Sequence, residues 1–236
     1  MAQLVAIDNK NHLNLKVDVS KAELHGASLH LVPAVVSEFA NMAVQYPLVL
    51  TKHEETGQLV CAAMLGFEAG ENLFWQGEQW QGLYLPLQIR RQPFFVGNAD
   101  KERDYVICID SDSPTISQNV GQPIFTENGE ETEYFQQAKS CLAQLLQGEL
   151  ENKQLLELLE QMDLLQVMKM EITFSNKQST TLNGLYTVDE EKLAALSSEQ
   201  MTILHKAGFL PAIYALIISL GQMHHLIDLK NKMLGC

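Results

Sequence analysis

The chain has 236 residues, of which 46% are hydrophobic, and a formal net charge of -13. This length and composition fit one large domain, or two closely packed ones, with a substantial core, and they argue against disorder. The acidic balance argues against sequence-independent binding to nucleic acid, which needs a surface rich in Lys and Arg, and against adsorption to anionic lipid.

The beginning of the chain, MAQLVAIDNKNHLNLKV, lacks a basic head followed by an apolar run of signal-peptide length. We therefore expect a cytoplasmic protein. Cys61, Cys108, Cys141 and Cys236 are spread along the chain without a close pair, which excludes the usual zinc spacing and gives no disulfide framework. Reduced thiols are the expectation.

The first half of the chain predicts short elements. Leu4–Ile7 and Leu13–Val17 have the pattern of short strands. The stretch HLVPAVVSEFANMAVQYP predicts a helix with Pro33 in its first turn and Pro47 after its end. The polar break Glu54-Glu55-Thr56-Gly57 separates the apolar runs 48–52 and 59–67, a pattern typical of a β-hairpin.

Further strands are predicted later in the chain. Tyr105–Ile109 is a run of β-branched and apolar residues typical of a strand. Val167–Phe174 and Thr180–Val188 predict a second hairpin, with a bulge or local turn at Asn183-Gly184 in its return strand.

Two helices are predicted in the middle of the chain. The first begins at Thr132, and we expect Gly148 to break it. The second covers Asn152–Leu165, with leucines on one face and a solvated acidic face opposite.

The last third of the chain carries helix-capping signals. Asp189 is a good N-cap for a short helix, and Ser197 with Gln200 forms a capping-box pattern for a helix that should end at Gly208. The longest predicted helix, Leu210–Lys232, follows.

That last helix raises the question of a membrane span. Its apolar run, Phe209–Leu220, is shorter than the roughly 20 residues needed to cross a bilayer. We therefore expect a buried core helix, with Ile213, Leu216, Ile217 and Leu220 inside, and no membrane span.

Together these patterns predict an α+β fold, in which hairpins and short strands form a mainly antiparallel sheet and the middle and C-terminal helices form a helical subdomain. A single domain covering residues 1–236 is favoured. A subdivision into a strand-rich part, 1–130, and a helix-rich part, 131–236, is the alternative.

The stretch YLPLQIRRQPFF, residues 84–95, places Arg90 and Arg91 together in an otherwise acidic protein. The pair is open to two interpretations: a structural fork that holds internal carboxylates or carbonyls, or a receptor for an anionic partner. We favour the structural fork.

Asp110 and Asp112 follow the predicted strand directly and are candidate ligands for a hard cation such as Mg²⁺ or Mn²⁺. Haloacid-dehalogenase-like phosphatases and nucleotide-sugar transferases use similar pairs, but the chain lacks the early position and the strand-helix alternation of the former. An acidic turn before Pro114 is favoured over catalysis, and the pair could meet Arg90 or Arg91 in an internal fork.

Histidines and serines elsewhere give no triad or ligand spacing. His25 and His30 stand without an acid or cysteine at ligand spacing, and a solvated or capping role is favoured for both. The adjacent His224 and His225 are typical of a helix leaving the core, and no Gly-x-Ser-x-Gly elbow is present.

Seven blocks that run in order through nearly the whole chain resemble the bacterial SapC family, named from a locus for the paracrystalline surface layer. The blocks are HLVPAVVSEFANMAVQYPLVL, MLGFEAGENLFW, YLPLQIRRQPFF, CIDSDSP, GQPIFTENGEETEY, LNGLYTVDEEKLAAL and YALIISLGQMHHL. The resemblance implies an association with surface layers and outer-envelope gene neighbourhoods, and it supplies no catalytic residues.

We therefore expect a non-enzymatic accessory or interaction protein with a protein partner and no cofactor. The alternative is a metal-assisted phosphate or nucleotide-sugar enzyme that uses Asp110 and Asp112. The oligomeric state is left open by the sequence.

Overall fold

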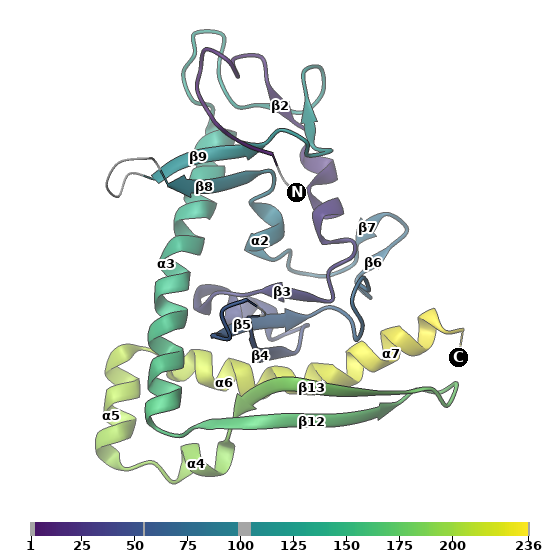
Figure 1. The fold of residues 1–236 in the computed structure, drawn as a ribbon, viewed down its shortest axis with the longest axis vertical. Coiled ribbons are helices and arrows are strands. Elements are labelled where there is room, and N and C mark those ends of the chain that lie inside the picture. The colour runs from purple at the N-terminus through teal and green to yellow at the C-terminus, as the bar shows by residue number, and fades with distance from the viewer. Residues whose placement is uncertain (1–2, 54, 99–104, 236) are drawn as a thin grey trace. The chain divides into compact units, whose positions relative to one another are not determined.

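The computed structural model describes residues 3–53, 55–98 and 105–235 (Figure 1). The chain divides into two compact units, each made of two chain segments. Unit 1 comprises Met1–His25 and Leu87–Gln147, and unit 2 comprises Gly26–Pro86 and Gly148–Cys236. The units alternate along the chain, so neither coincides with the ranges 1–130 and 131–236.

Unit 1 is built on small antiparallel sheets. Its elements are β1 (Leu4–Ala6), β2 (Lys16–Val17), the 3-10 helix η1 (Val19–Gly26, which ends at the boundary), α2 (Leu87–Arg90), β8 (Phe94–Asn98), β9 (Tyr105–Asp110), β10 (Ile116–Ser117), β11 (Gln122–Pro123) and the first half of the long helix α3 (Glu133–Gln161). One sheet has the order β1-β9-β8 and the other β10-β2-β11. Phe135 and Leu142 of α3 join Phe94 and Ile109 in the core of this unit.

Unit 2 is built on a five-stranded antiparallel sheet of order β12-β13-β4-β5-β3. Its elements are β3 (Leu31–Pro33), the 3-10 helix η2 (Val36–Glu38), α1 (Phe39–Met42), β4 (Leu48–Lys52), β5 (Leu59–Met64), β6 (Trp75–Gln76), β7 (Gln79–Trp80), the second half of α3, β12 (Leu165–Thr173), β13 (Ser179–Val188), α4 (Glu190–Ala194), α5 (Ser198–Ala207), α6 (Leu210–Ser219), the 3-10 turn η3 (Leu220–Gln222) and α7 (Met223–Met233). Helix α6 packs against β13 and β4. Helices and antiparallel sheets in both units confirm the α+β class.

Both predicted hairpins are confirmed, as β4–β5 and β12–β13. In the first turn, Glu54 lies outside the described residues and Gly57 has a φ of 67°. In the second hairpin the pairing register shifts beside Gly184, whose φ is 75°, which confirms the predicted bulge. A positive φ is easily adopted by glycine because it has no Cβ.

The helix predicted to start at Pro33 is wrong at its beginning. Pro33 lies in β3 and faces Ala62 of β5. Because β3 is the outer strand of the sheet, the amide that proline lacks is not needed there. Helical structure begins only at Val36 and ends at Met42.

The predicted break at Gly148 is also wrong, because α3 continues through it. A Cβ at this position would lie 2.5 Å from Val35 Cβ, so the glycine allows Val35 to approach the helix closely. The residue that suggests a break in the sequence thus serves a packing contact.

The predicted capping signals are confirmed. Asp189 Oδ1 accepts a hydrogen bond from the Lys192 amide at 3.1 Å, and Ser197 and Gln200 form the capping box of α5. Gly208 ends α5 with a φ of 77°. The final predicted helix is present but interrupted by η3 between α6 and α7.

By length and composition alone, the segment Leu210–Met233 could cross a membrane, and 33% of its most apolar window is buried in the protein. Core helices of soluble proteins pass the same test. Ile213 and Leu216 are buried as predicted, whereas Ile217 and Leu220 are only half-buried.

Candidate functional site

Arg91 makes internal contacts between α2 and β8. Its Nε donates to Gln88 Oε1 at 2.7 Å, and its Nη1 donates to the Phe94 carbonyl at 2.8 Å. The guanidinium also lies 4.1 Å from the centre of the Phe95 ring. The half-buried, planar guanidinium, stacked on an aromatic ring, therefore links the end of α2 to β8. An ammonium group cannot make the same set of contacts.

Arg90, its neighbour, is exposed at the end of α2. Within residues 3–53, 55–98 and 105–235, no hydrogen bond or ion pair is made by its side chain. The two arginines therefore differ: one holds the backbone of unit 1, and the other presents its charge to solvent.

Asp110 lies at the end of β9, where its carboxylate organises the following turn. Its Oδ1 accepts hydrogen bonds from the amides of Gln3 at 3.0 Å and Asp112 at 3.2 Å. Asp112 is exposed. Among the described residues, no group of three or more His, Cys, Asp or Glu side chains is placed to hold a metal ion, so Asp110 and Asp112 stand as a pair without a third ligand.

His25 joins this turn from the end of η1. Its Nε2 lies 3.0 Å from Ser113 Oγ, which is itself 2.8 Å from Thr115 Oγ1. Burial lowers the pKa of His25, while the charge of Asp110 raises it and that of Arg91 lowers it further. No local pattern predicts this contact, because the two residues are 88 positions apart in the chain.

A neutral imidazole beside a serine hydroxyl has the composition of a nucleophilic pair. Ser113, however, is only 6% exposed, and its hydroxyl already contacts Thr115, which is fully buried. The geometry is that of a turn whose polar groups satisfy one another.

A second candidate site lies on unit 2, between α1 and α6. Helix α1 turns Phe39 and Met42 into the core, which leaves Ala40, and Val44 just after the helix, on the outside. The segment after α1 is anchored by the buried Tyr46, whose hydroxyl donates to the Tyr84 carbonyl at 2.6 Å. This anchor fixes the position of α1 on the unit.

Helix α6 is fixed to the sheet by one buried hydroxyl. Ser219 Oγ accepts a hydrogen bond from the Leu48 amide at 2.9 Å and donates to the Leu216 carbonyl at 2.7 Å. Ile213 and Leu216 pack inward with it, so the opposite side of the helix faces outward.

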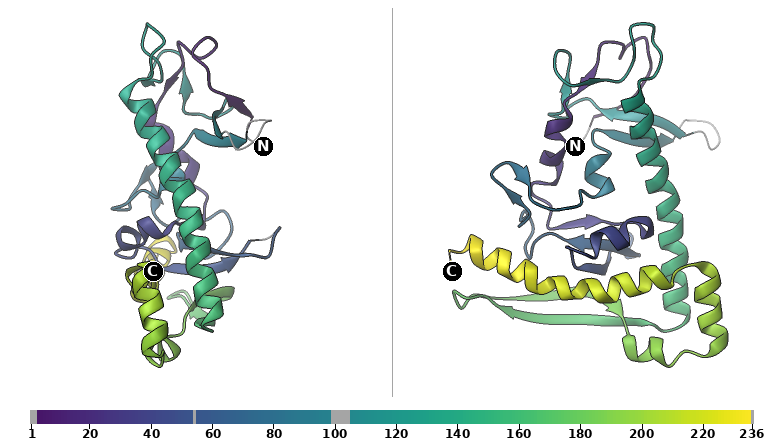
Figure 2. Two further views of the ribbon diagram at one scale, coloured as in Figure 1. Left: turned by 90° about the vertical axis from the view of Figure 1, so that its left-hand side faces the viewer. Right: turned by 180° about the vertical axis from the view of Figure 1, so that it is seen from behind.

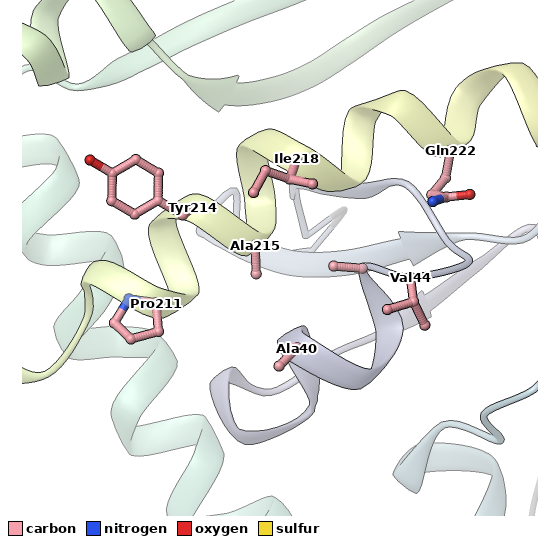
Figure 3. A pocket seen from close by; sticks show the side chains of 8 residues that line it. Ala40, Val44, Pro211, Tyr214, Ala215, Ile218 and Gln222 are labelled. Atoms are coloured by element: carbon pink, nitrogen blue, oxygen red, sulfur yellow. The ribbon is translucent and has the colours of Figure 1, made fainter.

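The outward sides of α1 and α6 border a shallow, open groove of about 560 Å³ (Figure 3). It is lined by Ala40, Ala43, Val44, Pro211, Tyr214, Ala215, Ile218 and Gln222. Val44, Tyr214 and Ile218 have exposed fractions of 62%, 47% and 68%. Only Tyr214 and Gln222 bring polar side-chain groups to the lining, so the groove can make apolar contacts and few hydrogen bonds.

This groove was not predicted from the sequence, because the apolar residues of α6 were expected to lie in the core. The available signal was that α6 is apolar nearly all round, with Ala215 and Ile218 between the core positions. A helix that is apolar on every side either buries all of its sides within the protein or leaves some of them exposed for a partner.

A family model described as SapC matches residues 7–226. The chain belongs to the SapC family. No curated protein and no solved structure matches it. Both the β9 turn and the α1–α6 groove lie within the residues that the SapC model covers.

Proposed function

We propose that this SapC-family protein is a non-enzymatic interaction protein linked to surface-layer or outer-envelope biogenesis, and that it binds an amphipathic helix of a partner protein in the α1–α6 groove. The observation that carries the proposal is the exposure of Val44, Tyr214 and Ile218 around an apolar groove. The link to the envelope rests on family membership.

The lining of the groove suits a helix. Ala40, Ala43 and Ala215 are small, so a partner backbone can approach α1 and α6 closely. Val44 and Ile218 stand beside them as large apolar contacts (Figure 3). Helix-in-groove recognition uses this arrangement, because the apolar stripe of the incoming helix fills the groove and its polar face remains in water.

Charge favours one kind of helix. The protein carries a net charge of -13, so a helix whose apolar stripe is flanked by Lys and Arg is attracted, and one flanked by Asp and Glu is repelled. The proposed occupant is therefore a basic amphipathic helix of a protein.

A synthetic peptide tests the proposal. We expect a fluorescently labelled helical peptide of Leu and Lys, with its leucines on one face, to bind in an anisotropy titration. A peptide of the same composition with its leucines scattered should bind at least about tenfold more weakly, because it loses the apolar contacts but keeps the charge.

Ala215→Arg should abolish the difference between the two peptides by filling the groove. The matched control is Ala207→Arg, which adds the same charge at the exposed end of α5. Equal binding of both peptides to the wild-type protein, or a preference that survives Ala215→Arg, would contradict the proposal.

A further inference from the structure

The strand β12 forms the edge of the five-stranded sheet in unit 2. It pairs with β13 on one side, and within the part of the chain that the structure describes no backbone hydrogen bond joins its other side to another segment. The strand is nine residues long and contains no proline. Long, regular, open edges are the ones to which another strand adds.

The bulge of this hairpin lies on β13 and leaves β12 regular. The step from Met168 to Met170 on β12 is matched by the longer step from Leu185 to Leu182 on β13. A bulge on β12 itself would twist the edge and discourage pairing. Because β12 has no bulge of its own, its outward backbone groups stay in a straight row that can pair with another strand.

The outer part of the hairpin is a two-stranded ribbon that runs alongside α7 (Figure 2). The pairing of β13 with β4 is confined to Leu185 and Tyr186. The tip is nevertheless held in place, because the Ser175 amide donates to Asn231 Oδ1 at 2.9 Å and the Phe174 ring lies 5.4 Å from that of Phe67. The edge is therefore already positioned for a further strand.

The side chains of β12 select a particular partner. Val167, Lys169, Glu171 and Thr173 are exposed on one face, and Met168 and Ile172 are buried on the other. Residues that face each other in an antiparallel pair lie on the same face of the sheet. When a second copy of β12 pairs with the first through a two-fold axis, the axis must therefore pass where one residue faces the same residue of the other copy.

Only one position of the two-fold axis brings residues of opposite charge to face each other. With the axis at Met170, Lys169 faces Glu171 of the second copy, and the same contact forms again on the other side of the axis. Centring on Lys169 or Glu171 instead places that residue opposite itself, where like charges repel. The sequence of β12 is thus complementary to itself in a single register.

We propose that the protein forms a homodimer by antiparallel pairing of β12 with β12 of a second copy, centred on Met170, which joins two five-stranded sheets into one. The backbone groups of the two edges supply the pairing, and the Lys169–Glu171 contacts set the register. This dimer does not use the α1–α6 groove and does not depend on the function proposed for it.

Charge reversal tests the register by sedimentation equilibrium. Lys169→Glu and Glu171→Lys should each weaken the dimer by roughly tenfold or more, because each places like charges in contact twice. The double variant Lys169→Glu/Glu171→Lys should restore it. An equimolar mixture of the two single variants should form a heterodimer, since each charge then meets its opposite.

Cysteine substitution tests the geometry. Met170→Cys should form an intermolecular disulfide on mild oxidation, because residue 170 faces itself, and Val167→Cys should not. The wild-type protein controls for the native thiols, and Ala215→Arg should leave the dimer intact. A wild-type monomer at every accessible concentration, or a dimer insensitive to both charge reversals, would overturn the proposal.

Discussion

The turn after β9 in unit 1 and the α1–α6 face of unit 2 differ in whether their side chains have partners within the protein. At the turn, the polar side chains of Asp110 and His25 are taken up by neighbouring amides and by a hydroxyl. On the α1–α6 face, the large apolar side chains of Val44 and Ile218 are left in solvent. Groups already satisfied within the protein have little to offer a ligand, whereas exposed apolar side chains gain from being covered.

This difference explains why residue type is a poor guide to the site here. Adjacent arginines and an Asp-x-Asp motif are conspicuous in a sequence, yet Arg91 and Asp110 organise local backbone. The alanines of the groove are inconspicuous, and they become informative only when α1 and α6 are brought together.

The sharpest contrast within the apolar face is between Ile213 and Ile218, which lie on the same helix. Ile213 is fully buried, so Ile213→Asp should lower the free energy of unfolding by more than about 3 kcal/mol through burial of an unpaired charge. Ile218→Asp should change it by no more than about 0.5 kcal/mol, because Ile218 is exposed. Urea denaturation of both variants measures the difference, and similar losses would show that α6 does not have one buried and one open side.

The close approach at Gly148 should give the next largest effect. Gly148→Ala should destabilise the protein by about 1–2 kcal/mol, because the overpacking against Val35 exceeds the gain in helix propensity of about 1 kcal/mol. In a Val35→Gly background the clash is gone, so the same change should become stabilising. A denaturation cycle of the four proteins detects this change of sign, and equal effects in both backgrounds would refute the packing explanation for Gly148.

The two arginines sharpen the comparison at the polar turn. Arg91→Lys should cost about 1–2 kcal/mol of unfolding free energy, because an ammonium cannot donate to Gln88 and Phe94 together while stacking on Phe95. Arg90→Lys, at an exposed position, should stay within about 0.5 kcal/mol. Thermal melts of the two variants measure this, and an unchanged melting temperature for Arg91→Lys would rule out the fork.

The smallest expected effect is a dependence of stability on pH. The folded state lowers the pKa of His25 below its ordinary value of 6.5. The contribution of His25 to the free energy of unfolding is therefore fully present when the pH is above that ordinary value. It is lost as the pH falls toward the lower pKa of the folded state, because the unfolded chain then binds more protons than the folded one. His25→Gln should lose less stability than the wild type over this acidic range. Parallel curves for the two proteins would mean that His25 is not held neutral.

Local signals in the sequence predicted much of the fold. Asp189, Ser197 and Gly208 act on backbone groups within a few residues, so their roles follow from position alone. The bulge beside Gly184 is predictable for the same reason.

Features that depend on distant residues were not predictable. The role of Gly148 depends on the close approach of Val35, and His25 contacts a hydroxyl that is 88 positions away in the chain. The groove is of the same kind, since α1 and α6 are far apart in the chain. Its lining could be found only once the faces of both helices were known.

Photo-crosslinking in the cell tests most directly whether the α1–α6 groove is a binding site. The photoreactive residue p-benzoylphenylalanine would replace Ile218 in the groove or, as a control, Ile203, which is exposed on α5. We predict that position 218 crosslinks to a discrete protein through a basic amphipathic helix, that Ala215→Arg removes this product, and that position 203 does not form it. The same products from both positions, or a product at 218 that survives Ala215→Arg, would contradict the account.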